Sequence, residues 1–170
     1  MSWNDDYENV LESIRQNSLM MKKYHTKNYI SLKAQLKYYK IPVIVISALN
    51  SVSSVGLERY IKQQYISGIT CILALLCGII GSIELYLGIQ SGMENELVSS
   101  KDYYVLSTDI YKTLSLNREH RGGTGKDMLD DYYSRYIKIT DNSNIIRRKY
   151  KDALFEVPQL TENTHLHSLT

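Results

Sequence analysis

The sequence predicts an all-α protein: a two-helix transmembrane hairpin with long amphipathic cytosolic helices before and after it. Three observations support this fold class. Two apolar runs follow each other at residues 41–57 and 65–89, residues 5–40 contain no proline or glycine, and apolar side chains recur at helical spacing on both sides of the runs. The mean hydropathy of −0.28 suggests a soluble protein only because the charged remainder offsets the hairpin.

Residues 1–40 are predicted to form an N-terminal amphipathic region of one or two helices, with Asn4 or Asp5 as the cap. Their apolar positions follow a helical spacing: Val10, Leu11, Ile14, Met20, Met21, Tyr24, Ile30, Leu32, Leu36 and Tyr39.

The first apolar run, residues 41–57, begins with Pro42 near its start and would extend about 25 Å as a helix, a marginal span on its own. Four of its polar residues form one stripe at positions i, i+3, i+4 and i+7: Ser47, Asn50, Ser51 and Ser54. This stripe either hydrogen-bonds to a neighbouring helix or lines a wet path. Asn50 lies near mid-depth, where an unpaired amide is costly, so it requires a partner.

The second run, residues 65–89, holds a single charge, Glu84. As a helix it would reach roughly 37 Å, more than the bilayer core of about 30 Å. The seven-residue connection at 58–64 suits a tight turn, so we expect a membrane hairpin over residues 41–92. Glu84 either lies at headgroup depth with a packing role or serves a pore or inter-helix contact.

Small residues follow one side of the second run: Gly78, Gly81, Ser82, Gly88 and Gly92. Gly88 and Gly92 form a GxxxG pair, which lets helix backbones approach closely in lipid. The stripe supports either packing within the hairpin or self-association into a homo-oligomer. Cys71 and Cys77 are six residues apart, so on one helix they face different directions and cannot pair with each other.

The lysines of residues 21–40 orient the hairpin. The segment has six of them and no acidic residue, whereas the 58–64 connection has little net charge. Because positive flanks stay cytoplasmic, we expect both termini of this integral membrane protein on the cytoplasmic side. A total net charge of +2 does not favour nucleic acid as a partner.

Residues 93–155 are predicted to form a C-terminal cytosolic helical region. Residues 93–116 continue the second helix, with Tyr103, Leu106, Ile110 and Leu114 on one face. After a loop at 117–125, Thr124 and Asp127 cap a helix with Leu129, Tyr132, Tyr133, Tyr136 and Ile137 on one side. A short basic helix begins near residue 145, and the tail at 156–170 is expected to be disordered.

No catalytic, cofactor-binding or metal-binding set emerges, and we expect no enzyme. The RGGTGKD segment departs from a P-loop, because His120 replaces its first glycine and Asp127 its Mg²⁺-binding hydroxyl, so we expect a flexible helix–helix loop. The four histidines lie far apart except His165 and His167 in the tail.

The layout resembles the SLATT superfamily over residues 33–154. The resemblance rests on the Tyr38–Pro42 entry to the first run, the Gly-rich second run, and three later sets: Leu106, Ile110, Leu114 and Leu116; Arg118 and Arg121; Met128, Leu129, Tyr136 and Ile137. It implies a membrane protein that oligomerises and forms a pore on a partner's signal. The alternative is a structural protein, for example of a large virus's internal membrane, which tethers the bilayer to protein partners through its cytosolic helices.

Overall fold

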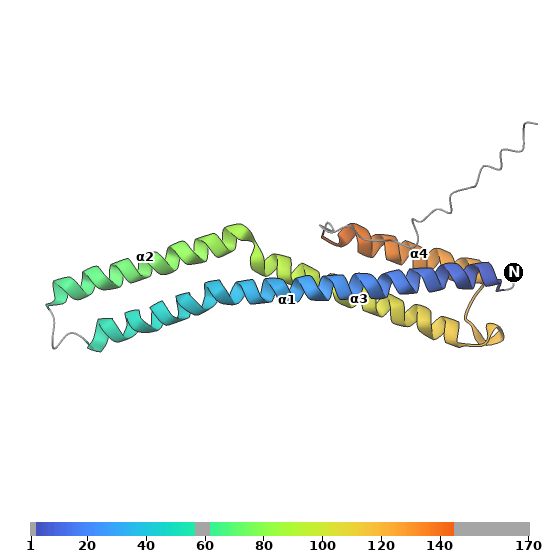
Figure 1. The fold of residues 1–170 in the computed structure, drawn as a ribbon, viewed down its shortest axis with the longest axis horizontal. Coiled ribbons are helices and arrows are strands. Elements are labelled where there is room, and N and C mark those ends of the chain that lie inside the picture. Colours follow the sequence, from blue (N-terminus) through green and yellow to red (C-terminus); the bar gives the residue numbers. More distant parts are fainter. Residues whose placement is uncertain (1–2, 57–61, 145–170) are drawn as a thin grey trace, which may run out of the picture.

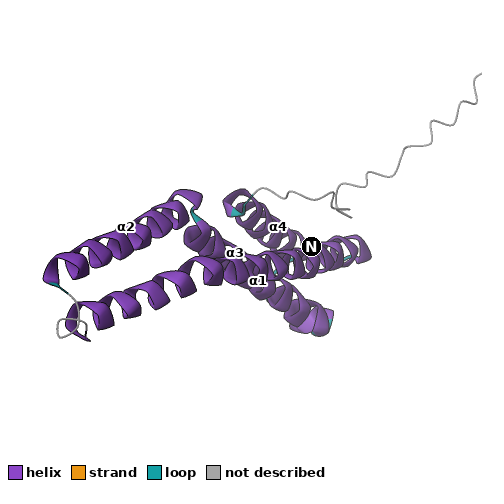
Figure 2. Cartoon of the chain, turned by 60° about the vertical axis from the view of Figure 1, so that its left-hand side comes forward, coloured by secondary structure: helices purple, strands orange, loops and turns teal. Residues whose placement is uncertain are grey.

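The computed structural model describes residues 3–56 and 62–144, and this part of the chain is helical apart from short connections (Figures 1 and 2). The elements are α1 (Asp5–Gly56), α2 (Gln63–Leu87), α3 (Ile89–Ser115), a short 3₁₀ turn η1 (Arg118–His120) and α4 (Gly125–Asn142). The described residues contain no strand, which confirms the all-α prediction for them.

The long helix α1 connects two parts of the molecule. Its first half packs with α3 and α4 as a three-helix bundle, and its second half lies beside α2 as a helical hairpin (Figure 1). α2 and α3 both run antiparallel to α1. The register stays nearly constant along the rod, since Lys40 pairs with Glu84, and Thr26 with Ser100.

The bundle core comes from all three of its helices. α1 supplies Leu11, Ile14 and Met21, α3 supplies Tyr103, Leu106 and Ile110, and α4 supplies Tyr132 and Tyr136, joined by Trp3. These positions are three, four or seven residues apart within each helix, so each set forms one stripe that is removed from water. Tyr133, expected on the same side of α4, is instead 48% exposed.

Two helix boundaries differ from the sequence expectation. α1 continues through Pro42 without ending, so no helix boundary separates residues 1–40 from the first apolar run. Conversely, the second run does not continue smoothly into residues 93–116. Gly88 adopts a left-handed conformation with φ 59°, ends α2 and redirects the chain into α3. Glycine adopts this conformation without the steric cost that a Cβ would impose.

The loop between α3 and α4 is docked against the start of α1. Glu8 accepts hydrogen bonds from Arg118 and Arg121 at 2.7 and 2.6 Å, and Arg118 also pairs with Asp5. The two guanidinium groups lower the pKa of Glu8 to about 2. Arg121 also stacks over the Trp3 ring, 4.4 Å from its centroid. The RGGTGKD segment is therefore docked against the start of the chain through Arg121.

The predicted cap of α4 is confirmed. The Thr124 side chain accepts a hydrogen bond from the Asp127 backbone N–H at 3.2 Å. The expected basic helix near residue 145, the tail at 156–170 and residues 57–61 of the hairpin turn lie outside the described residues.

Replacing Gly125 by alanine is expected to destabilise the bundle by about 1–3 kcal/mol, because the new methyl group overpacks the docked loop. A Cβ at Gly125 would lie 2.8 Å from Cδ2 of Tyr7 and 3.5 Å from the Trp3 backbone. Thermal unfolding followed by far-UV circular dichroism measures the change. Gly122→Ala is the control, since a Cβ there meets nothing within 4 Å. Equal effects of the two substitutions would contradict the docked loop.

Candidate membrane hairpin and its polar contacts

The most apolar part of the chain is also the least covered. Among the described residues one helical run, Gln63–Ser115, is long and apolar enough to cross a membrane. Its most apolar 18-residue window has a mean hydropathy of 2.3, and only 6% of that window is buried. Ile72, Leu75 and Leu85 of α2 are 60, 64 and 81% exposed. The helix therefore presents apolar side chains to its surroundings instead of to a protein core.

The apolar half of α1 lies alongside α2 but is less apolar. Ile44, Val45 and Leu49 are exposed to 65, 51 and 55%. The serines and the asparagine that interrupt the run reduce its hydropathy, so α1 is not apolar enough over its described length to count as a membrane span on its own. The structure thus shows a helical hairpin with one helix that meets the requirements for a membrane span.

Glu84 is held by a lysine of the opposite helix. Its carboxylate lies 2.8 Å from the Lys40 ammonium, and the Glu84 side chain is only 11% exposed while that of Lys40 is 50% exposed. Lys40 immediately precedes the apolar run of α1, and Glu84 lies one turn before the end of α2. The pair therefore marks the end of the hairpin nearest the bundle, where a lysine can extend its ammonium group towards water.

The polar stripe of α1 divides into three parts. Ser47 faces α2, and its hydroxyl lies 3.6 Å from the Cys77 sulfur. The hydroxyls of Ser51 and Ser54 donate to carbonyls of their own helix, at 3.0 Å in both cases. Such bonds satisfy a serine without a second helix. Asn50 differs, because its Oδ1 is buried and has no hydrogen-bond partner within the described residues.

The small residues of α2 and α3 have three different environments. A Cβ on Gly78 or Gly81 would meet nothing within 4 Å, so α1 does not fill the space beside them. The exposed Ser82 donates to the Gly78 carbonyl at 2.8 Å. Gly88 forms the bend. Gly92 lies in α3 against Leu32, and a Cβ added to Gly92 would lie 3.7 Å from Cδ1 of Leu32. The expected GxxxG pair therefore does not lie on one helix, because Gly88 is the bend between α2 and α3 and only Gly92 lies within α3.

A buried polar cluster joins α1 to α3 beside the hairpin. The Nδ1 of His25 lies 2.7 Å from Oε2 of Glu96, and both residues are nearly inaccessible to solvent, at 0 and 5% exposure. Asn28 and Asn144 donate to the same carboxylate, at 3.4 and 3.1 Å. The His25 ring stacks on Tyr103.

Sequence reasoning missed this cluster because its two principal members are 71 positions apart. A usable signal was present. His25 lies on the stripe of Leu11, Ile14 and Met21, and Glu96 lies seven residues before Tyr103. Polar residues at predicted core positions indicate buried pairs. Within the described residues, no group of three or more His, Cys, Asp or Glu side chains could hold a metal ion.

Comparisons with known proteins found a viral relative. The chain is 26% identical over 149 residues, covering 86% of this chain and 77% of the relative, to "Uncharacterized protein VP11" of Micromonas pusilla reovirus (isolate Netherlands/2005). No protein-family model matches the chain. No solved structure matches it either.

Reversing one charge of the Lys40–Glu84 pair is expected to lower the stability of the hairpin. Lys40→Glu places a second carboxylate beside the largely buried carboxylate of Glu84 and removes its ion-pair partner, so we expect a loss of about 1–3 kcal/mol in detergent micelles. The exchanged double variant, Lys40→Glu with Glu84→Lys, should recover most of it. Thermal unfolding measures both. Lys37→Glu is the control, because Lys37 is exposed and forms no ion pair with any described residue. Failure of the double variant to recover would contradict a direct pairing.

Proposed function

We propose that the chain is a non-enzymatic integral membrane protein whose hairpin crosses a bilayer twice and self-associates through α2. The observation that carries this proposal is the uncovered apolar surface of α2. Only 6% of its most apolar 18-residue window is buried. Exposing such a surface to water costs about 25 cal/mol per Å². Lipid acyl chains remove that cost without requiring another protein.

The contacts between α1 and α2 support insertion of both helices together. The first apolar run is marginal alone, but Lys40 neutralises Glu84 and Ser47 contacts Cys77 across the hairpin. These polar groups therefore face each other instead of lipid, which lowers the cost of transfer for both helices. The lysines of residues 22–40 lie on the bundle side, so the positive-inside rule favours a cytoplasmic bundle.

Self-association is supported by the open glycine face of α2. Gly78 and Gly81 have free space where a side chain would be, and small residues of this kind allow close helix contact in lipid. Cys71 is exposed and lies seven residues before Gly78, which places both on the same helix face. Cys77 instead faces α1, since its sulfur lies 3.9 Å from the Val43 carbonyl oxygen.

The pore-forming version of the proposal rests on Asn50. Its Oδ1 lacks a partner within the described residues, although an unpaired amide oxygen at membrane depth is costly. A neighbouring copy or a water-filled path between copies would supply the missing donor. The resemblance to the SLATT superfamily supports the same version.

A second candidate function is structural. The relative is a reovirus protein, and the bundle presents exposed Tyr104, Val105 and Tyr133 that suit a protein partner. In this role the hairpin anchors the bundle, and the bundle tethers the bilayer to other proteins. High-copy recovery of the chain in assembled virus particles, together with no ion flux from vesicles, would favour this role over the pore.

Oxidative crosslinking in reconstituted vesicles tests the self-association. The Cys77→Ser variant retains Cys71 and should form disulfide-linked dimers, whereas Cys71→Ser should form several-fold fewer, because Cys77 is directed towards α1. Gly78→Leu in the Cys77→Ser background should reduce crosslinking several-fold by filling the contact face. Ile79→Leu, at a neighbouring exposed position, is the matched control.

Two results would count against the proposal. Equal crosslinking through Cys71 and Cys77 would show that α2 has no preferred contact face. Release of the chain from vesicles by alkaline carbonate would show that the hairpin is not inserted. Ion flux measured in the same vesicles decides the pore version, because an inserted, crosslinkable oligomer without flux excludes it.

A further inference from the structure

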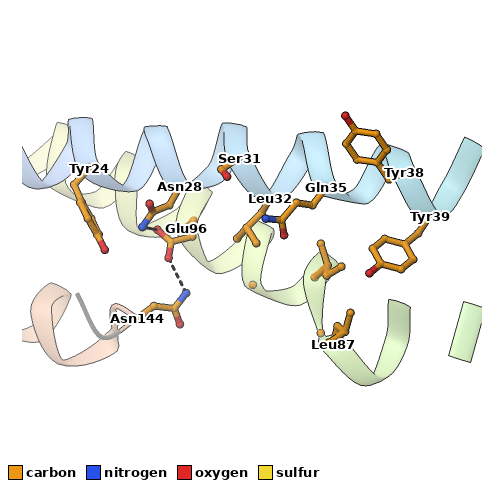
Figure 3. Close-up of a pocket in the computed structure, with 13 residues that line it drawn as sticks. Tyr24, Asn28, Ser31, Leu32, Gln35, Tyr38, Tyr39, Leu87, Glu96 and Asn144 are labelled. Carbon is orange, nitrogen blue, oxygen red and sulfur yellow. Dashed lines mark hydrogen bonds between the residues drawn. The ribbon is translucent and has the colours of Figure 1, made fainter. Parts of the chain in front are cut away.

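An open groove lies where the hairpin meets the bundle. It has a volume of about 1140 Å³ and is lined by α1, by the Gly88 bend, by the first turns of α3 and by Asn144 after α4 (Figure 3). Because Lys40 and Glu84 mark the adjacent end of the hairpin, the groove is at the depth of lipid headgroups if the hairpin spans the bilayer. The inference that this groove binds a lipid therefore rests on the proposed function.

The lining of the groove favours a cation over an anion. Glu96 is its carboxylate, and the described lining residues include no lysine or arginine. Glu96 accepts bonds from Asn28 and Asn144 and lies 2.7 Å from Nδ1 of His25. These three contacts leave about one of the four acceptor sites of an ionised carboxylate. Tyr24 lies beside it (Figure 3). An aromatic ring next to a carboxylate is a suitable environment for an ammonium group.

The chemical character of the groove changes along its length. Figure 3 shows Tyr24, Asn28 and Glu96 at the inner end, Ser31 and Gln35 beyond them, and Tyr39 and Leu87 at the outer end. Asn28 and Ser31 are separated by roughly 4.5 Å along the helix. Along the groove the carboxylate comes first, hydroxyl and amide donors come next, and apolar side chains come last. This order matches the ammonium, phosphate and acyl chains of a phospholipid.

We propose that this groove binds a phospholipid whose headgroup carries an ammonium group, such as phosphatidylethanolamine or phosphatidylcholine. The ammonium lies at the Glu96 and Tyr24 end of the groove, the phosphate accepts hydrogen bonds from Ser31 and Gln35, and the acyl chains leave past Leu87 onto the exposed surface of α2. An anionic lipid without an ammonium group is disfavoured, because its net negative charge meets Glu96 with no lysine or arginine among the described lining residues.

Lipid titration of the full-length chain in a nonionic maltoside detergent tests the proposal. Dihexanoyl-phosphatidylethanolamine and dihexanoyl-phosphatidylcholine should raise the thermal unfolding midpoint at concentrations about tenfold below those needed with dihexanoyl-phosphatidylglycerol. Free phosphocholine, which lacks acyl chains, should bind at least about tenfold more weakly than the corresponding lipid. Equal stabilisation by the anionic lipid, or equal binding of free phosphocholine, would overturn the assignment.

Variants assign the effect to the groove. Glu96→Gln should weaken ammonium-lipid binding about tenfold, whereas Glu94→Gln, at an exposed position of α3, should not. Because Glu96 is buried, a second variant avoids any folding defect: Gln35→Glu places a carboxylate beside the phosphate at an exposed position and should weaken binding similarly. Unchanged lipid preference in both groove variants would refute the site. Carbonate extraction of the same proteins reports insertion separately, so loss of the site and loss of the membrane placement are distinguishable.

Discussion

The structure depends on one constraint: α2 is an apolar helix that the described part of its own chain leaves largely uncovered. The bundle core is complete without it, since Leu11, Ile14, Tyr103 and Leu106 are fully buried among themselves and their neighbours. α1 contacts α2 along one side only, and large apolar side chains remain exposed on the others. In the proposed membrane placement, the low cost of such a surface in lipid, compared with water, accounts for a hairpin that extends away from the bundle instead of folding back on it.

The continuity of α1 links the two halves of the molecule mechanically. Because one helix forms part of both the bundle and the hairpin, a rotation of its apolar half about the helix axis would also turn its bundle half. The helices opposite α1 are interrupted at Gly88, which separates α2 from α3 and lets their axes differ in direction. The Lys40–Glu84 pair on one side of this bend and the His25–Glu96 cluster on the other fix the antiparallel register.

The sequence predicts the features that depend on local spacing. The all-α class, the apolar character of the second run, the Thr124 cap and the burial of Tyr103 each depend on residues within a few turns of one another. The bend at Gly88 is not predictable in this way, because a glycine at the end of an apolar run suits helix packing and a left-handed cap equally. The His25–Glu96 pair depends on the register between helices, which local spacing does not contain.

Membrane depth at both helices of the hairpin is the most direct test of the central claim. A nitroxide would be attached at Cys71, or at Leu49→Cys in a cysteine-free background. Its collision rates with oxygen and with a water-soluble nickel complex would then be measured in vesicles. Tyr104→Cys in the bundle is the aqueous reference. We predict that both hairpin labels are accessible to oxygen and protected from nickel, unlike the bundle label. Nickel accessibility at either hairpin position equal to that at position 104 would contradict a two-span membrane hairpin.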